Sequence, residues 1–310
     1  MAWNIRMNPA LSPGGAASLE QDWLNRSTAT GVMNAEDFRN AATFNAGIFP
    51  NSSQGDVSRD TTEFLTGTAC LKTDVPAASS GTPAWIFKLD STWNATNTSG
   101  IGSSDLYVQF RIKLGPNRLV PSNGGGGFKI FIMGGLDITG GIANSNSHTN
   151  DEFVISTYNW QIPSPYFETG NGTPPLWEPN GGGGDLFLQP AGNQLCLYSE
   201  LGAGLPHCWQ WPVGEWFTVM YRVRYANPGG TTGNQMDLYV ARYGQTSYTQ
   251  LFASRDFAIG SPDPKYPNGP NSLWMTPYDT GRVDSSVSTW HKYTQIIASR
   301  NFISCPQVYL

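Results

Sequence analysis

Residues 105–114, with the sequence DLYVQFRIKL, alternate strictly between apolar and other side chains. Neighbouring side chains of a β-strand point to opposite faces, so this stretch has two distinct faces. The apolar face holds Leu106, Val108, Phe110, Ile112 and Leu114, and the opposite face holds Tyr107, Gln109, Arg111 and Lys113. Alternation over this length predicts an antiparallel strand with one buried and one polar face.

Residues 216–225 (WFTVMYRVRY) show the same alternation and place Arg222 and Arg224 on the polar face. A loop rich in Pro, Gly and Thr separates them from a further strand pattern at 236–243, which predicts a hairpin. Other strand patterns cover residues 128–133, 153–158, 186–189, 194–199 and 293–303. No helical pattern of comparable length separates these strands, which indicates an all-β protein.

The composition of the 310-residue chain agrees with this fold class. It holds 35 Gly and 22 Pro, while 13% of its residues are aromatic and 13% are charged. Few charges combined with many aromatic and turn residues exclude an intrinsically disordered chain and a coiled coil. The net charge of −5 gives no general attraction for nucleic-acid phosphates, and no apolar run is long enough for membrane insertion as a helix.

The chain shows no internal repeat and no linker that would divide it. Residues 31–310 are therefore predicted to form a single two-sheet antiparallel jelly-roll sandwich. Residues 1–30 are predicted to form an extended N-terminal arm, because several Pro and Gly residues interrupt a helix there, although the pattern allows a short helical turn over 19–24. The first residues lack the apolar core of a signal peptide, so we expect synthesis in a host cytoplasm without secretion.

Three motifs follow one another in an order that resembles the concanavalin A-like lectin/glucanase superfamily: GEWFTVMYRVRY (214–225), GNQMDLYVAR (233–242) and YTQIIASRNFI (293–303). The stretches DLYVQFRIKL and FKIFIMGG (128–135) resemble the paired strands of its polysaccharide-lyase members. The resemblance covers about residues 69–303 and implies a concanavalin A-like jelly roll. A fold does not by itself carry a function.

The segments DWLNRSTATGVMNAEDFRN (22–40) and GTACLKTDV (67–75) resemble uncharacterised tailed-bacteriophage proteins that carry this β-domain. This resemblance implies a non-enzymatic virion protein that decorates the capsid or belongs to the tail. Its expected partners are other virion proteins and further copies of itself, with a host cell-surface polysaccharide as a candidate ligand. A lyase-like glycan depolymerase and a soluble lectin are the two alternative functions.

Catalytic residues are not recognisable in the sequence. A retaining glycosidase needs two carboxylates about 5–5.5 Å apart, and the only acids at positions i and i+2 are Glu20 and Asp22 in the arm. The lyase members carry an Arg-Ser/Thr-Glu-Leu-Arg strand, whereas the matching residues 109–113 (QFRIK) hold no acid. No catalytic residue is predicted, and the chain is expected not to be an enzyme; if it is one, it is a polysaccharide lyase.

Aromatic and basic side chains are the candidates for binding a glycan or a partner protein. Five Trp are expected in or beside loops or at strand ends, where flat rings stack on sugars or anchor interfaces: Trp160, Trp177, Trp209, Trp211 and Trp274. Five basic residues are expected on a shared concave polar face: Arg111, Lys113, Arg222, Arg224 and Lys129. In the structural alternative, the Trp side chains close the ends of the sandwich and the basic residues form salt bridges.

No cofactor and no metal site is predicted. The glycine runs at 124–127 and 181–184 lack the Lys-Ser/Thr pair of a phosphate-binding loop. The histidines match no metal or triad spacing; they are His148, His207 and His291. The sequence leaves one alternative, a calcium ion held by loop carbonyls with Asp137, Asp151 or Glu152. The sequence also does not decide whether disulfides join Cys196 to Cys208 or Cys70 to Cys305.

Overall fold

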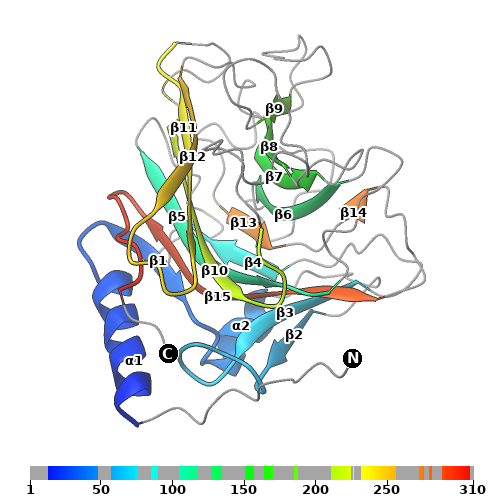
Figure 1. Cartoon of the computed structure of the whole chain (residues 1–310). Helices are drawn as coiled ribbons and strands as arrows, with labels where there is room; N and C mark the ends of the chain where they lie inside the picture. The colour runs from blue at the N-terminus through cyan, green and yellow to red at the C-terminus, as the bar shows by residue number, and fades with distance from the viewer. Residues whose placement is uncertain are drawn as a thin grey trace.

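The computed structural model of the chain describes residues 13–47, 57–75, 85–89, 105–116, 127–134, 151–156, 164–169, 185–187, 211–224, 226, 232–255, 272–275, 279–280 and 288–307 (Figure 1). These residues form two antiparallel sheets that face each other and two helices, α1 (Pro13–Ser27) and α2 (Ala41–Gly47). The prediction of an all-β, two-sheet jelly roll is confirmed.

The larger sheet has the strand order β12-β11-β10-β5-β15-β3-β2 in the described residues, and β1 also pairs with β15. Its strands are β1 (Val32–Glu36), β2 (Val57–Asp60), β3 (Cys70–Val75), β5 (Leu106–Leu114), β10 (Trp216–Arg224), β11 (Gln235–Arg242), β12 (Thr249–Arg255) and β15 (Thr289–Ser299). The last strand of the chain, β15, therefore lies between β5 and β3 in the interior of the sheet.

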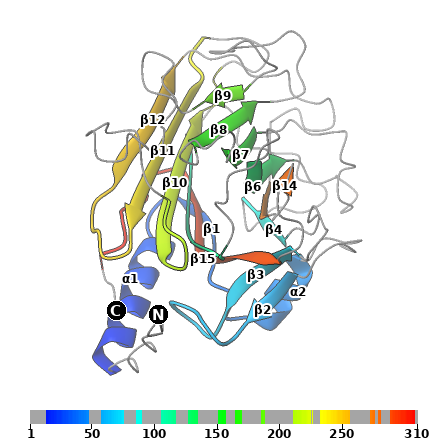
Figure 2. The same ribbon diagram turned by 45° about the vertical axis from the view of Figure 1, so that its right-hand side comes forward.

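The smaller sheet has the order β4-β13-β6-β7-β8-β9, with β14 also paired to β6. Its strands are β4 (Trp85–Lys88), β6 (Gly127–Gly134), β7 (Asp151–Ser156), β8 (Ser164–Thr169), β9 (Asp185–Phe187), β13 (Ser272–Met275) and β14 (Asp279–Thr280). Figure 2 shows that the larger sheet curves around the smaller one and that α1 lies on the outer side of the larger sheet.

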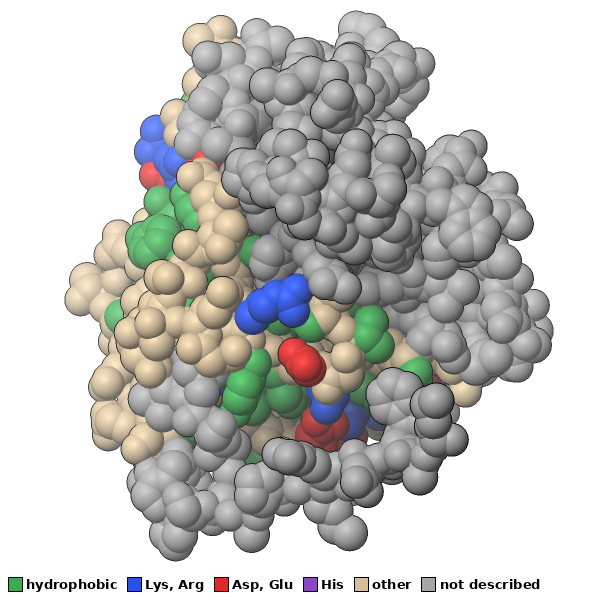
Figure 3. Space-filling view, in the orientation of Figure 1, with side chains coloured by type: hydrophobic (Ala, Val, Ile, Leu, Met, Phe, Trp, Pro, Cys, Tyr) green, Lys and Arg blue, Asp and Glu red, His purple; other side chains and the backbone are tan. Residues whose placement is uncertain are grey.

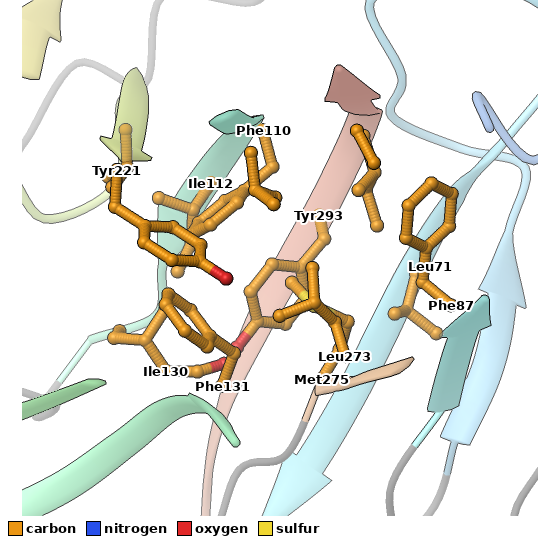
Figure 4. Packing of buried hydrophobic residues seen from close by; sticks show 14 of the residues in the cluster. Leu71, Phe87, Phe110, Ile112, Ile130, Phe131, Tyr221, Leu273, Met275 and Tyr293 are labelled. Atoms are coloured by element: carbon orange, nitrogen blue, oxygen red, sulfur yellow. The ribbon is translucent and has the colours of Figure 1, made fainter. Parts of the chain in front are cut away.

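The core fills the space between the two sheets. Phe131 of β6 stacks on Tyr221 of β10 with ring centroids 4.7 Å apart and meets Phe110 of β5 edge-on at 5.8 Å. The hydroxyl of Tyr293 donates a hydrogen bond of 2.8 Å to the carbonyl oxygen of Ile130, which ties β15 to β6 across the core (Figure 4). Burying each such aromatic side chain contributes about 1.5–3 kcal/mol, so these contacts hold the two sheets together.

The sequence located three long strands of the larger sheet. The predicted strands at 105–114, 216–225 and 236–243 correspond to β5, β10 and β11, and the predicted hairpin is confirmed by the pairing of Val219 with Val240. The pattern at 293–303 was placed too late in the chain, because β15 begins at Thr289 and ends at Ser299. The predicted strand at 194–199 lies outside the described residues.

The polar face of β5 is covered by protein, although the alternation predicted a solvated face. Gln109 and Arg111 are buried, with 0% and 1% of their surface exposed. The side chain of Gln109 contacts Arg26 of α1, Tyr248 and the carbonyl oxygen of Ser304. Segments from both ends of the described chain therefore pack on the outer face of the larger sheet.

Residues 13–27 form a helix instead of the extended chain that was predicted for the arm. Pro13 occupies the first helical position, where its missing N–H leaves no helical hydrogen bond unmade. Leu19 and Trp23 are one helical turn apart and are almost fully buried. Burial of this face offsets the low helix propensity of the two glycines in the first turn. Residues 1–12 of the arm lie outside the described residues.

Candidate functional site

Four of the five basic residues singled out in the sequence share one face of the larger sheet, whereas Lys129 lies on β6 of the smaller sheet. The register of β5 and β10 places Arg111 opposite Thr218, Lys113 opposite Trp216, and Arg222 opposite Tyr107. This face is the outer one, because the residues that alternate with them, such as Val108 and Val219, belong to the core. The face that was predicted to be a concave binding surface is therefore the side on which α1 packs.

Lys113 is neutralised by a segment that follows β2. Its Nζ forms an ion pair with Glu63, and Nζ of Lys292 on β15 lies 2.7 Å from Glu63 Oε2 and 2.7 Å from Asp60 Oδ2. The side chains of Lys292 and Asp60 are only 8% and 10% exposed. Two lysines and two carboxylates thus form a compact, charge-balanced cluster that fastens residues 60–63 to the sheet.

The pKa values in this cluster favour its charged form. Burial alone would raise the pKa of Asp60, but hydrogen bonds from Lys292 and Thr62 outweigh burial and lower the pKa to about 2. Glu63 is affected in the same way, since hydrogen bonds from Lys113 and Lys292 outweigh its burial and lower its pKa. Both carboxylates are therefore ionised at neutral pH, so neither fits the role of a general acid, which needs a raised pKa.

Arg222 and Arg224 are also paired. Nε of Arg222 donates to Asp105 Oδ1 at 2.8 Å, and its Nη1 donates to Asp237 Oδ2 at 2.9 Å. Nη2 of Arg224 donates to Asp105 Oδ2 at 2.6 Å. Two arginines thus face two aspartates, which leaves little net positive charge for an acidic glycan. Figure 3 likewise shows Lys and Arg side chains next to Asp and Glu side chains in the lower centre of the visible face.

A buried polar network joins α1 to the same face. Nε of Arg26 donates to Asp22 Oδ2 at 3.0 Å, Nη2 donates to Gln295 Oε1 at 2.8 Å, and Nη1 donates to Gln109 Oε1. Arg26 is 4% exposed and Asp22 is 7% exposed. An arginine whose donors are taken up by protein acceptors in this way positions a helix and is not available to a substrate carboxylate.

Gln295 belongs to an irregular part of β15. The pairing of β15 with β5 shifts register between Thr294 and Ile297, and Gln295 adopts a left-handed backbone conformation with φ of 52°. Its amide is held on both sides, by Arg26 and by a donated hydrogen bond of 3.1 Å to Thr66 Oγ1. Backbone strain of this kind costs about 1–3 kcal/mol, and the bulge turns the Gln295 side chain toward α1.

The tryptophans that the structure describes are buried. Trp211 is 3% exposed and packs edge-on against Phe217 in the core. Trp274, which was expected in or beside a loop or at a strand end, lies near the end of the short strand β13, is 6% exposed and donates from Nε1 to Ser272 Oγ at 3.1 Å. The Trp211 ring lies in the core and the Trp274 ring lies on the opposite side of β13 from Leu273, and both are buried, unlike rings that stack on a ligand. Trp160, Trp177 and Trp209 lie outside the described residues.

The outward face of the smaller sheet presents a different set of side chains. Leu273 and Phe87 point into the core, so the residues that alternate with them point outward. The register of β13 and β4 places Trp274 opposite Ile86 and Ser272 opposite Lys88, and Lys88 is exposed. Of these four residues Trp274 and Ser272 are buried, at 6% and 0% exposed, Ile86 is half-buried, and Lys88 is the exposed one. Sequence reasoning missed this grouping because β4 and β13 are short and lie far apart in the chain.

The remaining candidates have structural positions. His291 is fully buried, with Nδ1 3.0 Å from the hydroxyl of Tyr293 inside the sandwich. Cys70 and Cys305 are buried free thiols and not a disulfide. Among the described residues, no group of three or more His, Cys, Asp or Glu is placed to hold a metal ion. The other loop candidates, His148, His207, Asp137, Cys196 and Cys208, lie outside the described residues, and the side chains of Asp151 and Glu152 are not described.

No helix in the described part of the chain has the length and apolar character needed to cross a membrane. No protein-family model and no curated protein sequence matches this chain.

Solved structures do match it. The endo-β-1,4-glucuronan lyase of the fungus Trichoderma reesei is 11% identical, with a TM-score of 0.50 over 89% of this chain and 100% of the lyase. The marine PL-14 alginate lyase of Aplysia kurodai is 8% identical, with a TM-score of 0.52 over 87% of this chain and 99% of the lyase.

These likenesses correct the functional expectation. The non-enzymatic virion protein expected from the sequence, whether capsid decoration or tail protein, is contradicted, because the structural neighbours are polysaccharide lyases. At such low identity the likeness shows the fold alone. The chain has the concanavalin A-like jelly-roll fold.

Proposed function

We propose that this protein is a polysaccharide lyase that cleaves a uronate-containing glycan by β-elimination. The observation that carries the proposal is the match to two such lyases over practically their whole length. The charges on the two sheet faces indicate where such a polymer would bind.

The outer face of the larger sheet is a poor place for an acidic glycan. Arg26, Arg222 and Lys292 are each bonded to protein carboxylates, and α1 packs over part of this face. A glycan carboxylate would have to displace these partners and leave buried charges unpaired, which costs about 3–5 kcal/mol for each broken pair.

The outward face of the smaller sheet is the better candidate for the substrate groove. Half-buried Ile86 supplies apolar surface on β4, and Lys88, two residues further on the same face, places a positive charge at the surface that suits a uronate carboxylate. In β-elimination a base removes the proton at the carbon that bears the carboxylate. The electron pair left behind forms a carbon–carbon double bond, and the bond to the glycosidic oxygen breaks as that oxygen takes up a proton.

Product analysis tests the reaction type. Purified protein is incubated with glucuronan and with alginate, and the oligosaccharides are analysed by mass spectrometry. Elimination gives a new non-reducing end that lacks one water relative to a hydrolysis product. Fully hydrated products would indicate a hydrolase instead, and an uncleaved polymer in both incubations would argue against the proposal.

A further inference from the structure

A cleft separates α1 from the C-terminal segment that packs beside it. In Figures 1 and 2 the segment that follows β15 runs next to α1. The cleft has a volume of about 580 Å³, which falls within the range of about 300–1,000 Å³ typical of ligand sites. It lies on the outer side of the larger sheet, away from the groove proposed for the lyase substrate.

The cleft carries no net charge. Its charged lining residues are Asp22 and Arg26, which lie 2.9 Å apart in a buried ion pair. Asp22 Oδ1 also accepts a hydrogen bond of 3.0 Å from the backbone N–H of Gln307. Since both charges are matched inside the protein, a carboxylate or phosphate ligand would find no unmatched positive group among these lining residues.

The other polar side chains that line the cleft are amides and hydroxyls. Gln21 and Asn25, one turn apart on α1, join in a hydrogen bond of 2.8 Å from Gln21 Nε2 to Asn25 Oδ1. This bond uses one donor and one acceptor, so the amide oxygen of Gln21 and the amide nitrogen of Asn25 keep their capacity for a ligand. Neutral donors and acceptors side by side match the hydroxyl groups of a sugar.

Phe302 supplies an aromatic wall. Its side chain is 54% exposed and lines the cleft. Its ring is supported edge-on by Tyr107, Tyr239 and Tyr248, at centroid distances of 5.8, 5.8 and 6.0 Å. An aromatic ring that is fixed by its neighbours and half exposed can stack on a sugar ring at little entropic cost.

We infer that this cleft binds an uncharged sugar unit, as a carbohydrate-binding site separate from the lyase groove. Phe302 stacks on the sugar ring, and the amides of Gln21 and Asn25 bind its hydroxyls. The inference goes beyond the proposed lyase function and does not depend on it, because its ligand is neutral and its residues lie on α1 and in the segment after β15, on the outer side of the larger sheet.

Calorimetric titration of the full chain tests this site. The probes are the hexasaccharides of cellulose, mannan and xylan, together with an alginate hexasaccharide as the acidic comparison. We expect at least one neutral probe to bind and the alginate probe to bind at least tenfold more weakly at this site. Phe302→Ala should weaken neutral binding about tenfold, whereas Phe302→Trp should retain it.

Leu24→Ala is the matched control, because Leu24 is a 40% exposed apolar residue of α1 outside the cleft lining. Gln21→Ala, an exposed substitution, gives a second test if Phe302→Ala unfolds. Absence of neutral binding by the wild type, or equal affinity of wild type and both cleft variants, would overturn the inference.

A parallel cleavage assay separates the two proposals, because Phe302→Ala should leave cleavage unchanged. A protein that cleaves no polymer but still binds neutral sugar would contradict only the lyase function.

Discussion

Nη2 of Arg26 in the first helix donates a hydrogen bond of 2.8 Å to Oε1 of Gln295 in the last strand, so two ends of the described chain meet at one guanidinium group. The same group also binds Asp22 and Gln109. Arg26 therefore acts as the clamp that holds α1 on the outer face of the larger sheet, and through α1 it shapes one wall of the neutral cleft.

Arg26→Met should destabilise the fold by about 3–5 kcal/mol, because it leaves Asp22 as an unpaired buried carboxylate. Urea unfolding measures this loss. Gln21→Ala is the control on the exposed side of the same helix, and its effect should stay within about 0.5 kcal/mol. Equal unfolding curves for Arg26→Met and the wild type would show that the clamp contributes nothing.

Lys292→Met should cost about 3 kcal/mol, since it removes the cation that Asp60 and Glu63 share. The control is Lys72→Met, whose ion pair with Asp74 is more exposed, at 28% and 25%, and is worth less than about 1 kcal/mol. Thermal unfolding of both variants gives the comparison. A larger effect for Lys72→Met than for Lys292→Met would contradict the account of this cluster.

Stability should fall in acid partly through Asp60. Its pKa is lowered from 3.8 to about 2 in the folded protein, so the stability it contributes is fully present above pH 3.8 and is lost as the pH falls toward about 2. Asp60→Asn should therefore be less stable than the wild type at pH 6, and the difference should shrink as the pH approaches 2. Urea unfolding across this pH range measures it, and a pH-independent difference would refute the assignment.

The Cys70 thiol should be unreactive in the folded protein. Burial raises its pKa to about 12, and its Sγ lies 3.0 Å from the carbonyl oxygen of Glu63. Iodoacetamide at pH 8 should leave the Cys70 peptide unmodified in native protein and modify it fully in urea. Rapid labelling of that peptide without denaturant would show that the thiolate is accessible.

The sequence predicted those elements whose side-chain pattern is local. Alternation alone located β5 and β10, and a loop rich in turn residues predicted their neighbour β11. The same alternation misjudged the environment of Arg111 and Gln109, because the segments that cover them come from distant parts of the chain. Periodicity reports which residues share a face and not what packs on that face.

For the first helix, the sequence analysis predicted the wrong secondary structure. The Pro and Gly residues at 13–15 argued against a helix there, and the pattern allowed only a short turn over 19–24, whereas the packing of Leu19, Trp23 and Arg26 on the sheet stabilises a helix over 13–27. The cation–carboxylate pairing of Arg222 with Asp105 and Asp237 likewise depends on the register between strands, which the sequence does not specify. For the same reason, the outward grouping of Trp274, Ser272 and Lys88 could be identified only in the folded chain.

The central claim is that this chain cleaves an acidic glycan by elimination, and ultraviolet absorbance tests it most directly, because each elimination creates an unsaturated uronate that absorbs. Wild type, Lys88→Gln and the control Lys72→Gln are incubated with glucuronan, alginate and a neutral glucan. We predict rising absorbance with at least one acidic polymer and none with the glucan, with KM raised about fivefold for Lys88→Gln and unchanged for Lys72→Gln. No absorbance rise with any acidic polymer, from protein shown to be folded, would contradict the claim.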